Sequence, residues 1–291
     1  MRALLIRTGP SFGLHELYSL LLLYSSSAIV AVGTILKQHS VDVDYWHIPI
    51  KFGIPTTQME YSERLKKFRK LIKSSNYDFI GFSCISCDEY LHILEFAKIC
   101  KEEKPDTITV IGGYHATVVA QEIMKDTKYI DIVVRGDFEP ICKKFIKAIR
   151  NHEFLKEVPN IIFRQNDRII ETPRMLIEYD INTLPRYDFS IVEEYMSSLG
   201  TLSIEGSRGC KFKCEYCTEA TVRGGHFWSV KKPKKLIDEL KIYSSFMEEH
   251  TGYKRFFFVD PLFGIDRKWL NDFCHKLIES NLNVTWGCEH V

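Results

Sequence analysis

The chain has 291 residues, which is enough for one large domain or two ordinary ones. Hydrophobic residues make up 45% of it and charged residues 26%, as in folded globular proteins. The formal net charge is only +1, so the composition argues against a protein that binds nucleic acid or an anionic membrane through a broad basic surface.

The first residues, the most apolar stretch and the number of cysteines bear on the cellular compartment in which we expect the protein. The chain starts with a strand-like apolar run at residues 3–6, without the basic segment and cleavage site of a signal peptide. The most apolar stretch, residues 17–32, is interrupted by Ser25, Ser26 and Ser27 and is too short to cross a bilayer. Nine cysteines, an odd number scattered along the chain, do not suggest a disulfide framework. We therefore expect a protein of the reducing cytoplasm.

Strand-like and helix-like segments alternate over the first 150 residues. Continuously apolar runs predict buried strands, and segments with helical periodicity lie between them. The expected strands are 3–6, 41–46, 78–83, 107–111 and 130–134, and the expected helices are 25–38, 60–73, 88–104 and one ending near 150. Buried strands separated by helices predict an α/β fold, a doubly wound, Rossmann-like parallel sheet covered on both faces.

Polar and glycine-rich loops follow the expected strands, at the edge where parallel sheets bind ligands. They comprise residues 8–16, 83–87, 112–117 and 136–139. Glycines there let a ligand approach the backbone, and the helix start that follows favours an anionic group. The first strand is not followed by G-x-G-x-x-G, so an ordinary dinucleotide site is not expected. The alternative is that these glycines only permit tight turns.

The middle of the chain predicts a connection. Residues 158–171 are expected to form a hairpin that turns at Asn166 and Asp167. Residues 172–199 have weak periodicity and are expected to form a linker packed between two domains. The predicted organisation is therefore a first domain over 1–150, a hairpin and linker over 151–199, and a second domain over 200–291.

The second domain has too few elements to close on itself. Strands are expected at 201–204, at 256–259 and from 283, with helices at 233–248 and 268–280. Three parallel strands cannot close a barrel and would leave a strand edge unpaired. Either another chain covers that edge or the 291 residues are the front part of a longer protein, and we favour the second interpretation.

Three cysteines after the strand 201–204 form the most specific motif. Cys210, Cys214 and Cys217 have C-x3-C-x2-C spacing. Thiolate ligands favour zinc or an iron–sulfur cluster. A closed structural site needs four ligands, whereas three leave one position open for chemistry. The alternatives are a zinc site completed by His226, or three cysteines without a metal.

The whole layout resembles the cobalamin-dependent radical S-adenosylmethionine (radical SAM) enzymes. Segment 206–217, GSRGCKFKCEYC, resembles the cluster loop of that family, including Arg-Gly before the first cysteine. Segments 112–117 (GGYHAT) and 133–139 (VVRGDFE) resemble its paired cobalamin-binding loops. Segment 184–188 (LPRYD) resembles its linker motif, and segment 258–263 (FVDPLF) resembles a strand end of its barrel.

The resemblance implies a fold and three cofactors. The first domain would bind cobalamin, and residues 200–291 would form the first part of a (β/α) radical SAM partial barrel, truncated after about three strands. The three cysteines would hold a [4Fe-4S] cluster whose open iron binds S-adenosylmethionine. Reduction would cleave S-adenosylmethionine to a 5′-deoxyadenosyl radical that abstracts a substrate hydrogen.

The resemblance also implies binding residues. The expected cobalamin contacts are Ser83, Gly112, Gly113, His115, Gly136 and Glu139. The expected S-adenosylmethionine contacts are Tyr216, Asp260 and Glu289. Apart from the resemblance, a lone histidine after two glycines, such as His115, is more often a hydrogen-bonded loop residue than a metal ligand. The chain lacks D-x-H-x-x-G, so cobalamin is expected to bind without a histidine as lower ligand of cobalt.

The expected reaction is methylation of an unactivated centre of a small-molecule substrate, with methylcobalamin as donor. Ring rearrangement or cyclisation is the alternative within the family. Two further alternatives are a radical enzyme whose first domain is only a scaffold, and a truncated cofactor- or metal-binding module without activity. The resemblance implies an electron donor such as flavodoxin or ferredoxin, and neither a nucleic acid nor a membrane as partner.

Overall fold

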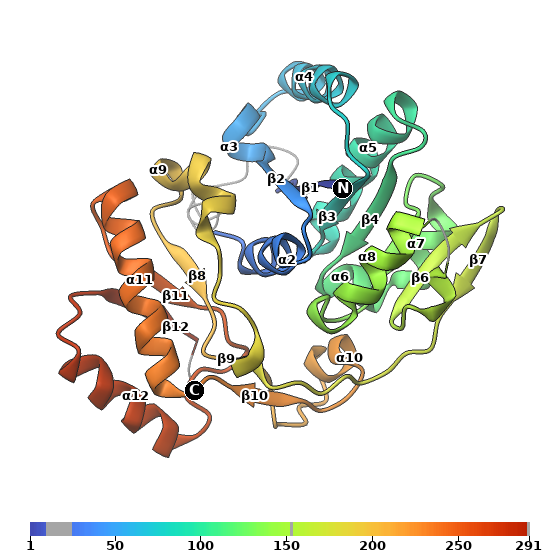
Figure 1. Cartoon of the computed structure of the whole chain (residues 1–291). Coiled ribbons are helices and arrows are strands. Elements are labelled where there is room, and N and C mark those ends of the chain that lie inside the picture. The colour runs from blue at the N-terminus through green and yellow to red at the C-terminus, as the bar shows by residue number, and fades with distance from the viewer. Residues whose placement is uncertain (10–24, 152–153, 290–291) are drawn as a thin grey trace.

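Two β-sheets lie on opposite sides of one buried helix, α2 (Ser27–Gln38), as Figure 1 shows. The structure is a computed structural model and describes residues 1–9, 25–151 and 154–289. Most of the predicted loop at residues 8–16 lies outside the described residues. The larger sheet has the strand order β2-β1-β3-β4-β5-β6-β7. Its strands are β1 (Arg2–Arg7), β2 (Asp42–His47), β3 (Phe79–Ser83), β4 (Ile108–Gly112), β5 (Ile132–Val134), β6 (Ile161–Gln165) and β7 (Arg168–Glu171).

The first five strands of the larger sheet are parallel, as predicted. The chain order reverses between β1 and β3, and ligands bind at such a switch point in open α/β sheets. The pairing places Arg7 opposite Ser83, and Ser83 opposite Gly112. The carboxyl ends of β1, β3 and β4 therefore lie level with one another, and the loops that follow them share one edge.

The predicted hairpin is confirmed, and it also extends the larger sheet. β6 and β7 pair antiparallel, and Asn166 and Asp167 between them have φ angles of 47° and 59°. Two left-handed residues give the twist that a two-residue hairpin loop requires. β6 also pairs antiparallel with β5, with Val133 opposite Ile162. The sequence did not predict this second pairing.

Helices cover both faces of the larger sheet, which confirms the doubly wound α/β class. On one face, Phe68, Phe96 and Met124 belong to a core under helices α4, α5 and α7. On the other face, α2 and α8 bury Ile29, Phe145 and their neighbours. The helices of this part besides α2 are α3 (Ile48–Phe52), α4 (Gln58–Ser74), α5 (Cys87–Glu103), α6 (Tyr114–Val118), α7 (Ala120–Asp126) and α8 (Cys142–Asn151).

The smaller sheet is parallel and has the order β12-β11-β8. Among the described residues β12 pairs with β11 alone, so its other edge is unpaired, as predicted for one edge of this sheet. Helix α11 begins at Pro233, a favoured first helical position. The elements are α9 (Met196–Leu199), β8 (Leu202–Ile204), α11 (Pro233–Thr251), β11 (Arg255–Phe258), α12 (Arg267–Glu279) and β12 (Thr285–Cys288).

A short antiparallel ribbon between β8 and α11 was not predicted. It pairs β9 (Ser207–Gly209) with β10 (Trp228–Val230). The three motif cysteines and helix α10 (Glu219–Arg223) lie between these two strands in the sequence. The cysteine loop therefore starts from β9 and not directly from the strand 202–204.

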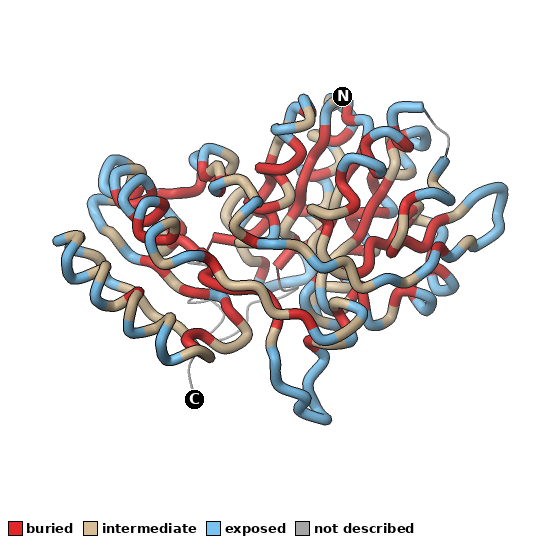
Figure 2. Tube along the Cα trace, turned by 60° about the horizontal axis from the view of Figure 1, so that its bottom comes forward, coloured by how far each residue is buried: buried red, intermediate tan, exposed pale blue. Residues whose placement is uncertain are grey.

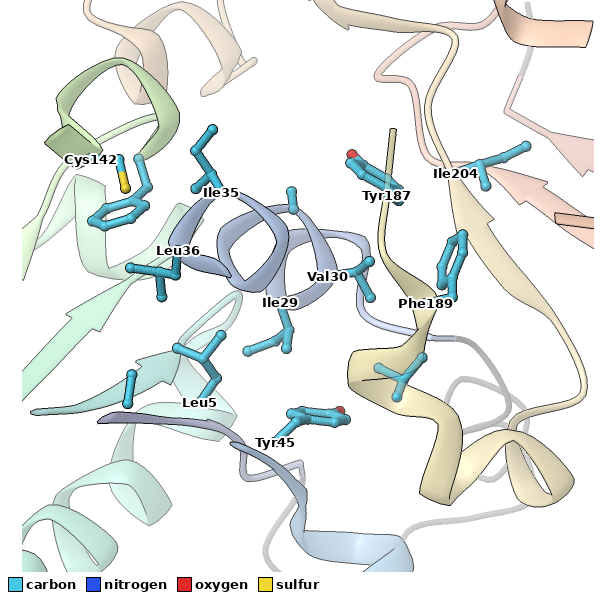
Figure 3. Close-up of a cluster of buried hydrophobic side chains, with 14 of the residues drawn as sticks. Leu5, Ile29, Val30, Ile35, Leu36, Tyr45, Cys142, Tyr187, Phe189 and Ile204 are labelled. Carbon is cyan, nitrogen blue, oxygen red and sulfur yellow. The ribbon is translucent and has the colours of Figure 1, made fainter. Parts of the chain in front are cut away.

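Helix α2 is buried on several sides because both sheets pack against it. Its side chains point towards Leu5 and Tyr45 of the larger sheet and towards Tyr187 and Phe189 of the linker (Figure 3). A Cβ atom on Gly33 would lie 2.7 Å from Cδ1 of Ile191, so glycine allows the linker to pack closely. Figure 2 shows that burial is concentrated in the strands and in the inward faces of the helices.

Polar contacts join α2 to the linker as well. The backbone N–H of Asp188 donates to Oγ1 of Thr34 at 2.9 Å. The ammonium group of Lys37 lies 2.5 Å from the carboxylate of Asp188. Ser25, just before α2, accepts a hydrogen bond from the backbone N–H of Ser203 at 2.8 Å. One continuous core thus runs from the larger sheet through α2 and the linker to the smaller sheet.

None of the helices in residues 1–9, 25–151 and 154–289 is both long and apolar enough to cross a membrane. Part of the apolar stretch 17–32 lies outside these residues.

His47 makes stability depend on pH. Its Nδ1 accepts a hydrogen bond from the backbone N–H of Ile50 at 3.3 Å, at the start of α3. Burial lowers the pKa of His47 from 6.5 to about 3, and Arg7 acts in the same direction. The unfolded chain therefore takes up a proton below pH 6.5 that the folded chain excludes. The stabilising contribution of the neutral ring is present above pH 6.5 and is lost as the pH falls towards 3.

His47→Asn should weaken this pH dependence, because asparagine can still cap α3 but does not titrate. Between pH 7 and pH 5 the wild type should lose about 2 kcal/mol more unfolding free energy than the variant. Urea denaturation at several pH values measures this difference. Parallel curves of unfolding free energy against pH for the two proteins would contradict the assignment.

Candidate functional site

A cavity of about 380 Å³ lies between the larger sheet, helices α2 and α8, and the start of the smaller sheet. Its inner part is apolar and is formed by side chains from both the sheet and the helices. These include Leu5 of β1, Phe79 of β3, Val110 of β4, Ala31 and Val32 of α2, and Phe145 of α8. The cavity therefore lies at the switch point and carboxyl edge where the fold is expected to hold a ligand.

Most of the predicted cobalamin contacts line this cavity. Ser83, Gly112, Gly113, Gly136 and Glu139 are all in its wall, although they come from three different strand ends. The predicted contact His115 is not among the lining residues. Its ring instead packs at 5.6 Å from the ring of Tyr90.

Two of the glycines allow backbone approaches that other residues would block. Gly113 has φ +110°, and a Cβ atom on it would lie 2.4 Å from the carbonyl oxygen of Cys84. Gly136 has φ +81°, and its Cβ atom would lie 2.8 Å from the carbonyl oxygen of Val222 in α10. Both glycines are therefore required by the backbone conformation of their turns, as the alternative interpretation held. Gly136 also brings the larger sheet against the segment that follows the cysteines.

A buried arginine joins the two parts of the cavity wall. The guanidinium group of Arg208 lies 2.7 Å from a carboxylate oxygen of Glu139 and 2.7 Å from one of Glu205. Burial would raise the pKa of Glu205, but the charge of Arg208 holds it below its usual value. Burial does raise the pKa of Glu139, where Arg208 opposes the shift only in part. The Glu139 carboxylate, expected to contact cobalamin, thus pairs with Arg208.

A second arginine repeats this arrangement beside the first. Arg223 of α10 pairs with Asp137, which follows β5, and with Glu219 in its own helix at 2.6 Å. The hydroxyl of Tyr114 donates to Glu219 at 2.6 Å, and the hydroxyl of Tyr179 donates to Asp137 at 2.8 Å. The charged groups at the cavity are therefore paired with one another.

The cysteine loop has a buried base and an exposed tip. Residues 202–209 are buried without interruption, whereas residues 211–218 are all exposed. Gly209 has φ +77°, and a Cβ atom on it would lie only 1.9 Å from the carbonyl oxygen of Phe227. The backbone N–H of Cys217 donates to the carbonyl oxygen of Cys214 at 3.0 Å, which forms a turn. The contact with β10 therefore fixes where the loop begins.

The three thiols are accessible and are not brought together. Cys214 and Cys217 are exposed and Cys210 is half-buried, and none of them is in a disulfide. Within the described part of the chain, neither these cysteines nor His226 belongs to a group of three side chains that could hold a metal ion. The donor set, three free thiols and no carboxylate, is one that suits a cluster.

The predicted S-adenosylmethionine contacts lie near this loop. Asp260, which follows β11, accepts hydrogen bonds from the backbone N–H of Gly206 at 2.9 Å and the hydroxyl of Ser207 at 2.5 Å. Burial raises the pKa of Asp260 to about 6. Tyr216 is 89% exposed, and the backbone carbonyl of Glu289 accepts from the N–H of Phe263 at 3.0 Å. Asp260 therefore already holds the base of the cysteine loop.

The sequence did not predict the roles of Arg208, Glu205, Asp137 and Arg223. Arg208 stands in the quoted motif 206–217, and Asp137 in the quoted motif 133–139. The sequence feature that could have indicated these roles is the presence of a charged residue in each of two loops that were expected to follow strands. The pairing of Arg208 with Glu139 and of Arg223 with Asp137 became visible only in the structure.

The cavity coincides with a match to a known family. Residues 20–146 match the family model described as the B12 binding domain. The anaerobic magnesium-protoporphyrin IX monomethyl ester cyclase of Rubrivivax gelatinosus is 29% identical over 234 residues, covering 75% of this chain and 40% of the relative. The cobalamin-dependent radical SAM methyltransferase TokK of Streptomyces tokunonensis is 21% identical over 216 residues, covering 70% and 30%. The chain is therefore similar to the cobalamin-dependent radical SAM enzymes.

A similarity in fold to one such enzyme extends over almost the whole chain. The cobalamin-dependent S-adenosylmethionine radical enzyme OxsB, solved with aqua-cobalamin and S-adenosylmethionine bound, superposes with a TM-score of 0.75 at 15% identity. The superposition covers 98% of this chain and 38% of OxsB. The chain spans less than half the length of the curated relatives, 47% at most for the first three. It therefore corresponds to only part of such an enzyme.

Gly113→Ala should destabilise the protein strongly, whereas Gly112→Ala should not. Alanine at 113 meets the Cys84 carbonyl and an unfavourable φ, which together should cost about 2–4 kcal/mol. A Cβ atom at 112 has its nearest neighbour at 3.8 Å, so that change should stay within about 1 kcal/mol. Urea denaturation of both variants tests the difference. Equal losses would show that the loop relaxes.

Proposed function

We propose that the chain is the cofactor-binding part of a radical SAM methyltransferase that uses cobalamin. Residues 1–150 would bind cobalamin, residues 151–199 would connect, and residues 200–291 would carry the cluster and S-adenosylmethionine. The match to the B12 binding domain and the names of the relatives support this proposal. Methyl transfer as the specific reaction is the part of the proposal that goes beyond the domain match and the names of the relatives.

The apolar cavity at the switch point is the observation that carries the proposal. Its volume of about 380 Å³ is that of a small-ligand pocket and suits one end of cobalamin, not the whole cofactor. Apolar walls between a sheet and two helices suit the aromatic base of the nucleotide tail. The backbone at Gly112, Gly113 and Gly136 lines the cavity and suits the amide side chains of the corrin ring, because backbone N–H and C=O groups can form hydrogen bonds with amides.

Ser83 and the three glycines would therefore hold cobalamin at the edge of the larger sheet. Glu139 would contribute to this binding edge by orienting Arg208, since its carboxylate is already paired with the guanidinium of that residue. His115 does not line the cavity, so its predicted contact would have to be with a part of cobalamin outside it. The absence of D-x-H-x-x-G still predicts binding without a histidine on cobalt.

Cys210, Cys214 and Cys217 would hold the [4Fe-4S] cluster. When bound, the cluster supplies the electron that cleaves S-adenosylmethionine, and cobalamin carries the methyl group. Asp260 would keep the base of the cysteine loop in place through Gly206 and Ser207. Tyr216 and Glu289 stay predicted S-adenosylmethionine contacts at the same edge.

Cyclisation is the second candidate reaction, because the Rubrivivax relative is named a cyclase and is more similar than TokK. Under either reaction the substrate would be a small molecule. We further propose cytoplasmic location and reduction by a flavodoxin or ferredoxin. The exposed tip at residues 211–218 supports access of such a donor.

Ala28→Trp should block cobalamin binding. Ala28 is exposed and lines the cavity from the first turn of α2, so an indole there would fill the entrance without entering the core. We expect the dissociation constant for hydroxocobalamin, measured by equilibrium dialysis, to rise at least about tenfold. Gln38→Trp, on the exposed end of the same helix and away from the cavity, is the control. Unchanged binding by Ala28→Trp would contradict the cavity assignment.

Cys214→Ala should abolish cluster formation, because two thiols cannot replace three ligands. The measurement is iron and sulfide content with visible absorbance after anaerobic reconstitution. Cys87→Ala removes another exposed thiol, outside the cysteine loop, and should reconstitute like the wild type. A colourless wild-type protein with stoichiometric zinc would exclude the cluster.

A further inference from the structure

Arg208 forms hydrogen bonds to two tyrosines in addition to its ion pairs with two carboxylates. Its side chain is 8% exposed and lies in β9, two residues before Cys210. Besides Glu139 and Glu205, its guanidinium donates to the hydroxyl of Tyr179 at 2.9 Å and to that of Tyr187 at 3.4 Å. The two tyrosines belong to the linker, so one side chain meets the larger sheet, the linker and the cysteine loop.

Glu139 connects this arginine to the cavity. It opens a 3₁₀ turn at Glu139–Ile141 that follows the loop at Gly136, and both residues line the cavity. Burial would lower the pKa of Arg208, but Glu139 and Glu205 hold it well above its ordinary value. The guanidinium is therefore charged and oriented by partners on both sides. A movement of residues 136–139 would move Arg208, and with it the stem of the cysteine loop.

We propose that Arg208 is a positioning residue that couples occupancy of the cavity to the arrangement of the three cysteine thiols. This inference rests on the proposed function in one respect, namely that cobalamin is the occupant. The planar guanidinium can bind two carboxylates and two hydroxyls at fixed angles, whereas an ammonium group cannot hold all four. The coupling requires arginine at this position, not only a positive charge.

Alkylation of the thiols by iodoacetamide tests the coupling without a cluster or any enzymatic activity. The full chain is treated under anaerobic, metal-free conditions, with and without saturating cyanocobalamin, and the modified peptides are quantified by mass spectrometry. Cys274, on α12, serves as the internal reference thiol. In the wild type, cyanocobalamin should change the alkylation rate of Cys210 about fivefold or more, the usual lower range for coupled sites.

Arg208→Lys should remove most of that change even when cyanocobalamin is saturating. Arg164→Lys is the matched control, because the guanidinium of Arg164 in β6 also donates two hydrogen bonds, to the carbonyl oxygens of Met124 and Thr127, but does not line the cavity. It should keep the wild-type response. If Arg208→Lys does not fold, Arg208→Met combined with Glu139→Gln removes the pair without leaving Glu139 charged, and the same loss of response is expected.

The outcomes separate this inference from the proposed function. An equal response in the wild type and in Arg208→Lys would overturn the role of Arg208, since the cofactor would then shield the thiols directly. A wild type that binds cyanocobalamin without any change at Cys210 would also overturn it. Failure of the wild type to bind cyanocobalamin would overturn the proposed function, and the coupling to it as well.

Discussion

Burial of helix α2 on several sides is the constraint on which the rest of the structure depends. A helix with one apolar face needs one packing partner, but α2 buries residues from Ile29 to Leu36 almost without interruption. The larger sheet covers one side, and the linker with the start of the smaller sheet covers the other. The two sheets therefore share a core, and separating them would expose α2 to water.

The position of the cavity follows from this sharing. Parallel strands end at one edge, and α2 starts near that edge, so its first turns form a wall of the cavity beside Leu5 and Phe79. The second wall comes from Arg208, Val222 and Val259 of the smaller part. Buried charges at such a seam are costly unless they are paired. The ion pairs of Arg208 with Glu139 and of Arg223 with Asp137 place opposite charges next to each other and connect the two sides of the seam.

Local patterns were enough to predict most of the elements. Buried parallel strands are apolar throughout, so 78–83 and 107–111 could be recognised, and Pro233 marks the start of α11. Three-residue strands such as β9 and β10 have no such pattern, and their pairing is decided by contacts between them. The pairing of β6 with β5 was not predicted, because it too depends on contacts between segments and not on the pattern within one segment. Of the candidate site, the glycines and cysteines could be named from motifs, whereas the ion pairs across the seam depend on long-range packing.

The two halves of the site differ in how firmly the protein itself determines them. The inner part of the cavity is built mostly from buried side chains, such as Leu5, Phe79 and Phe145, whose positions are fixed by close packing. The tip of the cysteine loop, residues 211–218, has no buried residue to hold it, and Phe212 and Tyr216 are 51% and 89% exposed. What the protein does determine is the stem, residues 202–209, through Asp260 on one side and Arg208 on the other. The direction in which the cysteines leave the core therefore depends on two buried side chains, and only one of them, Arg208, also contacts the larger sheet.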